Sequence, residues 1–252
     1  MHFWILFQKK RRSVYECDHK RSLCPEICPG IYRSASYTGN KGTDLKRSTA
    51  GCQLLYTILD ITDQQKKERL ADLCDHQPFI AKAPVVLVFC ADCRKWLSFY
   101  KEAGLTPRDP GPGDLFLAVE DALIAAQNAV TAAHSLDLGS CYIGDIMENA
   151  EDVKALLNLP EYVYPACMLV LGYPTDQQQS RPKPDRFSLS HMVCENEYQD
   201  KTGAEIQDMF TGHTGAKDYQ DWMRAFCARK YESDFSREMN RSAKVYLRDF
   251  LD

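Results

Sequence analysis

Basic residues near the start of the chain could bind a phosphate. They lie in the stretch QKKRRSVYECDHK, residues 8–20, where four cations are consecutive at Lys9–Arg12. Arginine can grip a phosphate through two parallel hydrogen bonds, and lysine attracts it as a point charge. A basic run of this length is more often simply solvated. The stretch by itself leaves both interpretations open.

Cysteines are the second residue type that could do chemistry. The chain has 11 of them, an odd number scattered through apolar stretches, which argues against a disulfide framework. Cys90 and Cys93 form a C-x-x-C pair, and Cys24 and Cys28 are also close in sequence. No second C-x-x-C or H-x₃-H pair completes the set of about four ligands that zinc needs. We therefore favour small buried thiols over a zinc or thioredoxin-like site, and predict no metal.

Two nucleotide-binding motifs are missing from the sequence. No G-x-G-x-x-G follows an apolar stretch, and the phosphate loop G-x₄-G-K-[ST] does not occur. We also find no set of nucleophile, base and orienting residue.

Composition favours an ordinary globular protein. Of 252 residues, 44% are hydrophobic and 26% charged, and the net charge is −4. This charge gives no reason to expect nucleic acid or an anionic membrane as a partner. In the opening MHFWILFQKKRR the cations follow the apolar run, unlike a signal peptide, and no stretch has about 18 consecutive apolar residues. We therefore expect a cytoplasmic protein without a membrane span.

Strands and helices alternate through the middle of the chain, which predicts an α/β or α+β fold. Apolar, β-prone stretches predict strands at 53–61, 83–92 and 165–174, and residues 140–146 are expected to be a short strand or loop that ends in a glycine-containing turn. Amphipathic or capped stretches predict helices at 62–76, 94–104, 115–137, 149–160, 217–231 and 236–251. The helix at 115–137 is apolar nearly all round and rich in alanine, so we expect it to be central or in a subunit interface.

Four stretches carry a resemblance to a known family. They are CDHQPFIAKAPVVLVFCAD (74–92), DALIAAQNAVTAAHSLDLGSCYIGDIMEN (121–149), LLNLPEYVYPACMLVLGYP (156–174) and RPKPDR (181–186). Each is unspecific alone, but their order and spacing are specific. Together they resemble the nitroreductase family, in its oxygen-insensitive nitroreductase and NADPH–flavin oxidoreductase branch.

This resemblance implies an α+β, three-layer fold. A central mixed, mainly antiparallel sheet would be flanked by helices, and two subunits would interlock as a homodimer. Residues 49–195 would form the core and residues 196–252 a C-terminal helical extension of the same domain. Two FMN molecules would lie in clefts at the dimer interface. Each would take a hydride from NAD(P)H and pass electrons to a small flat acceptor, a nitroaromatic, a quinone or a flavin, by a ping-pong mechanism.

The resemblance also implies the cofactor-binding residues. Gln77 would hydrogen-bond the polar edge of the flavin ring, for which an amide offers both donor and acceptor. The turn Tyr142, Ile143, Gly144 and Asp145 would pack against the ring, since glycine allows close backbone approach. No residue is predicted to be catalytic itself, because the flavin is the redox centre.

The remaining predicted residues would surround the FMN phosphate. Arg181 and Lys183 match the family's basic loop. Arg11, Arg12 and Ser13 match its N-terminal phosphate motif. The turn STAGCQ resembles the family's PTSGNMQ, so Thr49, Ala50 and Gly51 would add hydroxyl and backbone contacts.

The match breaks off within the N-terminal segment, residues 1–48, and is imperfect in the turn that follows it. Tyr15 replaces an expected arginine, Cys52 stands where Asn or Ser is usual, and residues 16–48 lack the periodicity of the expected helix. One hypothesis is divergence; another is that residues 15–47 are translated out of frame, which the coding DNA would test. An alternative function follows: a protein that keeps the fold but has impaired flavin binding and no catalysis.

Two further questions remain open from the sequence. Selection of NADPH over NADH needs cations for the 2′-phosphate, and Arg224, Arg229 and Lys230 are candidates that the sequence cannot position. Nucleic-acid binding through Lys9–Arg12 is disfavoured, because aromatic residues are not interleaved with the cations and the net charge is negative.

Overall fold

The computed structural model of the protein describes residues 49–183, 186–215 and 218–251. Their contacts define two compact units, residues 49–180 with 238–251, and residues 181–237. The predicted phosphate residues Arg11, Arg12 and Ser13 lie outside the described residues, as does the hypothesis about residues 15–47. The predicted division of the chain at residue 195 stays a prediction.

The first unit is built on a four-stranded sheet. Its strands are β1 (Tyr56–Asp60), β2 (Val85–Asp92), β3 (Gly139–Ile143) and β4 (Val163–Gly172), in the order β1-β2-β4-β3. All three pairings are antiparallel. The predicted α+β class and mainly antiparallel sheet are confirmed, and the parallel strand that a mixed sheet requires is not among the described strands.

Strand β4 begins earlier than the predicted residue 165, because a bulge accommodates its proline. Pro165 lies inside the strand opposite Cys90, where the register with β2 shifts between Phe89 and Cys90. Proline has no N–H to donate to a neighbouring strand, so an irregular point in the ladder is where a sheet tolerates it.

Helices alternate with the strands in the order that the sequence predicts. They are α2 (Gln64–Leu73), α3 (Pro78–Lys82), α4 (Arg94–Glu102), α5 (Pro112–Ser135) and α6 (Ala150–Leu157). Asp63 caps α2 by accepting hydrogen bonds from the N–H groups of Gln65 and Lys66. Helix α3 was missed by the sequence analysis, because five residues are too few for a periodic pattern.

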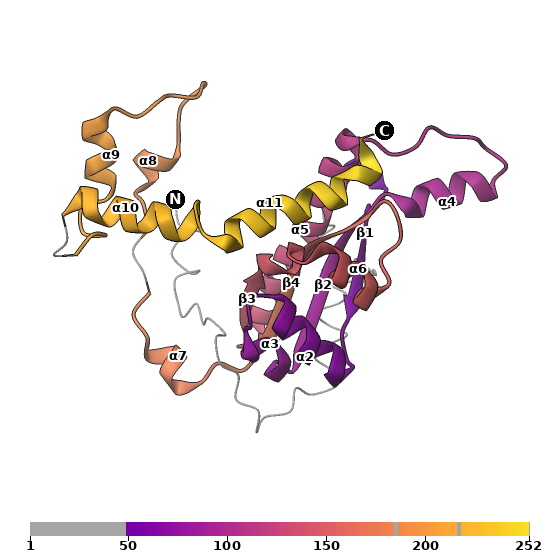
Figure 1. The fold of residues 1–252 in the computed structure, drawn as a ribbon, viewed down its shortest axis with the longest axis horizontal. Helices are drawn as coiled ribbons and strands as arrows, with labels where there is room; N and C mark the ends of the chain where they lie inside the picture. The colour runs from indigo at the N-terminus through magenta and orange to yellow at the C-terminus, as the bar shows by residue number, and fades with distance from the viewer. Residues whose placement is uncertain (1–48, 184–185, 216–217, 252) are drawn as a thin grey trace. The chain divides into compact units, whose positions relative to one another are not determined.

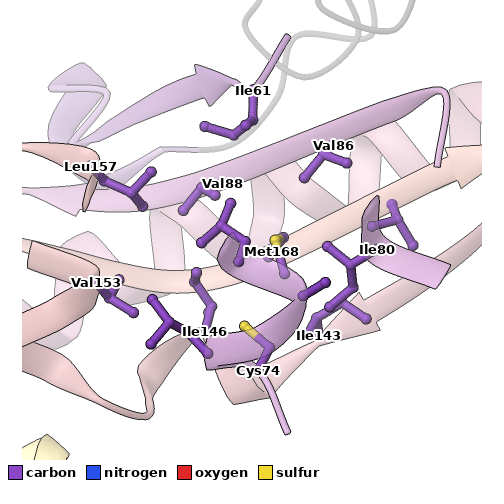
Figure 2. Close-up of a cluster of buried hydrophobic side chains, with 14 of the residues drawn as sticks. Ile61, Cys74, Ile80, Val86, Val88, Ile143, Ile146, Val153, Leu157 and Met168 are labelled. Carbon is purple, nitrogen blue, oxygen red and sulfur yellow. The ribbon is translucent and has the colours of Figure 1, made fainter. Parts of the chain in front are cut away.

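The two faces of the sheet bury separate apolar clusters, which gives three layers. Val86 and Val88 of β2 face a cluster that includes Ile80 of α3 and Val153 of α6 (Figure 2). Their neighbours in β2 face the alanines of α5 on the other side. In Figure 1, α2 and α3 accordingly lie together against one face of the sheet.

Helix α5 packs on the sheet through small side chains. Ala122, Ala125, Ala126 and Ala129 are fully buried, so the helix backbone can approach the strands closely. By length and composition alone this helix could cross a membrane, and it is the one helix among the described residues that meets that test. Core helices of globular proteins meet this test as well, and the buried alanines of α5 pack against the core.

The C-terminal helix α11 (Asp234–Leu247) completes the first unit with its later turns. Glu238 and Ser242 accept hydrogen bonds from the N–H groups of Asn149 and Ala150 at the start of α6, at 3.1 and 3.0 Å. These N–H groups have no acceptor within their own helix. A side chain from α11 therefore caps α6.

The described part of the second unit contains the first turn of α11 and three further helices, α8 (Leu189–Met192), α9 (Gly203–Met209) and α10 (Tyr219–Lys230). An aromatic cluster holds them: Phe210 contacts Phe187 and Trp222 with ring centroids 5.2 and 5.3 Å apart. The predicted C-terminal helices at 217–231 and 236–251 are thus confirmed as α10 and α11.

Candidate functional site

Gln77 is positioned at the junction of α2 and α3. Its N–H donates to the carbonyl of Ala71 at 2.8 Å, and Pro78 then begins α3 with a fixed φ. The side-chain Nε2 donates to the carbonyl of Cys74 at 2.9 Å. This bond fixes the amide and leaves its oxygen as an acceptor for a ring N–H, with one further N–H to donate.

The predicted ring-facing turn follows the edge strand β3. Ile143 is buried in the core, while Tyr142 is 42% exposed and its hydroxyl lies 3.4 Å from the side-chain oxygen of Gln127. Gly144 begins the short helix η3 (Gly144–Met147), and a Cβ added there would meet no atom within 4 Å. The backbone at Gly144 therefore lies open to a flat molecule.

These two predicted groups share one face of the sheet. Ile80 of α3 and Ile143 and Ile146 of the turn all lie in the same apolar cluster (Figure 2). The side-chain amide of Gln77 and the N–H groups that start η3 thus belong to one rigid structure. Together they offer the mixed donors and acceptors that a flavin edge needs, so these residues fit the cofactor.

A buried carboxyl group next to this turn, that of Glu148, was not identified from the sequence. Glu148 directly follows η3 and is only 5% exposed. Burial raises the pKa of Glu148 to about 7, and the neighbouring carboxylates of Asp145, Asp75 and Glu238 add to the rise. The sequence signal was the acidic pair Asp145 and Glu148 in GDIME, but hydrophobic periodicity alone does not predict that Glu148 is buried.

Thr49, Ala50 and Gly51 lie on the opposite face, against α5. The carboxylate of Asp121 accepts hydrogen bonds from the Thr49 hydroxyl at 2.6 Å and from the Ala50 N–H at 3.2 Å. The Thr49 hydroxyl also accepts from the Leu54 N–H at 3.1 Å, so it keeps only one lone pair for a ligand. Within one chain, the structure does not bring this turn together with Gln77 and Gly144.

A cavity of about 280 Å³ opens beside the same turn. Gln53, Trp96, Tyr100 and Leu117 are among the residues that line it. At its edge the two nitrogens of the Arg108 guanidinium contact Asp114 at 2.6 and 3.0 Å, and this hydrogen bonding lowers the pKa of Asp114.

The predicted phosphate cations Arg181 and Lys183 are exposed and belong to the second unit. Their approach to the residues of the first unit stays a prediction.

Cys90 and Cys93 are free and buried, and burial raises the pKa of each to about 12. A raised pKa favours the protonated thiol, which is the less reactive form. Among the described residues, no group of three or more His, Cys, Asp or Glu side chains could hold a metal ion.

Fold and site together define a class of protein. It is a three-layer α+β protein in which an amide and an open glycine turn, instead of a nucleophile and base, form the candidate site. Such a face suits a bound cofactor that carries the reaction.

Comparison with known proteins agrees with this class. The sequence profile of the nitroreductase family matches residues 53–173. An oxygen-insensitive NADPH nitroreductase from Salmonella typhimurium is 39% identical over 155 residues, which cover 61% of this chain and 62% of that protein. An FMN reductase (NADPH) from Bacillus subtilis is 30% identical over 210 residues, covering 81% of this chain and 82% of that protein.

A solved structure from Bacteroides fragilis NCTC 9343 superposes with a TM-score of 0.82 at 26% identity, covering 97% of this chain and 98% of that one. The chain belongs to the nitroreductase family. The predicted resemblance is therefore confirmed, although the match to the Salmonella protein spans less than two thirds of that relative's length.

Proposed function

We propose that the protein is an NAD(P)H-dependent FMN oxidoreductase that reduces nitroaromatics, quinones or flavins. The observation that carries this proposal is the shared face that holds Gln77 beside the open Gly144 turn. The names of its relatives support it, since one is an NADPH nitroreductase and another an FMN reductase (NADPH). Bound FMN would accept a hydride from NAD(P)H and deliver it to the acceptor.

The residues of this face would bind and orient the cofactor. The Gln77 amide, held by the Cys74 carbonyl, would pair with the polar edge of the ring. Because Gly144 has no side chain, the ring could lie directly against the backbone, within reach of the N–H groups at the start of η3. Arg181 and Lys183, which belong to the second unit, stay predicted phosphate-binding residues.

We further propose that the site is completed by a second copy of the chain. Gln77 and Gly144 lie on one face of the sheet, and Thr49–Gly51 lie on the other against α5, so one small cofactor cannot touch both groups within one chain. The outer side of α5 is apolar: Phe116 is 65% exposed, and Leu117, Leu123 and Ile124 are each more than 40% exposed. Sedimentation equilibrium would test this, with a dimer expected and a monomer contradicting it.

The activity is tested by loading the purified protein with FMN and adding NADPH or NADH without oxygen. We expect the yellow flavin absorbance to bleach and to return when a quinone is added. A protein that binds no FMN would instead support the alternative of a retained fold without catalysis. Comparing the two nicotinamides would settle which one is preferred.

A further inference from the structure

The loop between Thr49 and Leu55 has a strained backbone. Gly51, Cys52 and Leu54 all have positive φ, at 54°, 61° and 53°. For a residue with a Cβ this conformation is sterically unfavourable. Such residues persist only where their surroundings enforce them, and they concentrate at functional sites.

Asp121 of α5 supplies much of that enforcement. One carboxylate oxygen accepts from the Thr49 hydroxyl at 2.6 Å and from the Leu55 N–H at 2.9 Å, and the other accepts from the Ala50 N–H at 3.2 Å. The residue is 1% exposed. One buried side chain therefore joins the two ends of the loop.

The packing of α5 gives no reason of its own for a carboxylate at this position. Ala118, Ala122 and Ala125 on the same helix are fully buried, so an alanine would continue their stripe. Burying a charged carboxylate is unfavourable unless hydrogen bonds compensate. The compensation here comes from the loop.

A second contact holds the loop from its far side. The indole N–H of Trp96 donates to the Gln53 carbonyl at 2.7 Å. Gly51 and Cys52 remain exposed between these anchors. The loop is thus fixed at its ends and presents its apex to solvent.

We propose that Asp121 is a positioning residue, which holds the strained 49–55 loop in the one shape that lets Thr49–Gly51 contact FMN. The inference rests on the proposed function. Preorganising a loop raises affinity, because less ordering remains to be done on binding.

The test compares Asp121→Ala and Asp121→Asn with the parent and with Ser242→Ala. Asparagine keeps the shape but has one acceptor oxygen, so its amide must face at least one of the three donors. Ser242 is fully buried and caps α6 away from the loop, so its variant controls for lost stability. FMN affinity is measured by quenching of flavin fluorescence, and hydrogen exchange of the loop is measured without FMN.

We expect Asp121→Ala to weaken FMN binding at least about tenfold, Asp121→Asn less, and both to speed exchange of the Leu55 amide. Ser242→Ala should lower the melting temperature and change FMN affinity less than about twofold. If Asp121→Ala does not fold, Asp121→Asn decides.

The inference would be overturned if hydrogen exchange of the loop became faster while FMN affinity stayed unchanged. It would also be overturned if the loop exchanged as slowly in both variants as in the parent. A parent protein that binds no FMN would refute the proposed function and, with it, the role of the loop in binding. The two failures are thereby distinct.

Discussion

The two halves of the proposed site are held in different ways. Gln77 and Gly144 lie at the starts of the short helices α3 and η3, which are anchored by a large apolar cluster that includes Ile80, Ile143 and Ile146. The 49–55 loop has positive φ at three residues, and hydrogen bonds to the Asp121 carboxylate, from the Trp96 indole and from the Lys95 ammonium hold it. The stabilisation that comes from apolar burial is spread over many contacts, whereas the stabilisation of the loop comes from a few hydrogen-bonding atoms.

This difference predicts how each half fails. Damage to the apolar half should lower global stability and cofactor binding together. Substitutions that remove the hydrogen bonds to the 49–55 loop should act mainly on that loop, because strand pairing and the apolar clusters remain. The following changes test that contrast, from the largest expected effect to the smallest.

Ile146→Ala should cause the largest loss. The side chain is fully buried under the η3 turn, and removing such a group costs about 3 kcal/mol. Chemical denaturation should show the lower stability, and FMN affinity should fall in parallel. Normal stability with weak FMN binding would show that the turn is not supported by this cluster.

Glu148→Gln should change the pH dependence of stability. The pKa of Glu148 is raised to about 7 from 4.5, so between these values the folded protein binds more protons than the unfolded chain. Its contribution to stability is therefore full below pH 4.5 and is lost as the pH rises to about 7.

The glutamine variant should thus be more stable than the parent at pH 8, by up to about 3 kcal/mol, and nearly equal to it at pH 4.5. Denaturant titrations at the two pH values measure this. Glu151 and Glu238, whose pKa values are lowered to about 2, lose their contributions only at lower pH. An unchanged pH profile would mean that Glu148 is solvated in solution.

Gly144→Ala should separate binding from stability. An added Cβ meets no atom within 4 Å and φ is not left-handed, so the free energy of unfolding should change by less than about 0.5 kcal/mol. The methyl group would occupy the space proposed for the ring, so FMN should bind about tenfold more weakly. Fluorescence titration measures this, and unaltered affinity would remove Gly144 from the site.

Cys52 offers the mildest probe of the loop. It is exposed beside Gly51, and Cys227 is an exposed thiol in the second unit that serves as a control. We expect FMN to slow alkylation of Cys52, followed by mass spectrometry, and to leave Cys227 unaffected. Cys90 and Cys93 should stay unmodified because they are buried. Equal rates at Cys52 with and without FMN would place the loop away from the cofactor.

Sequence patterns predicted the buried strands and helices well. Runs such as VVLVFC and the alanine stripe of 115–137 encode β2 and α5 directly, because burial imposes their composition. Asp121 was missed although it interrupts that stripe, since its partners lie more than 60 residues away. The raised pKa of Glu148 likewise depends on Asp75 and Glu238, which only the fold brings near.

The claim that each cofactor is bound by both halves of the site, one from each copy, can be tested by complementation. Gly144→Val damages one half and Asp121→Ala the other, and each variant alone should bind FMN poorly. Differently tagged copies of the two variants are co-expressed, and purification on both tags isolates the mixed dimer. If the halves come from different copies, one of its two sites is intact, so about one FMN should bind per mixed dimer with near-parental affinity. If both halves come from the same copy, every site carries one damaged half, and the absence of any recovery would contradict the account.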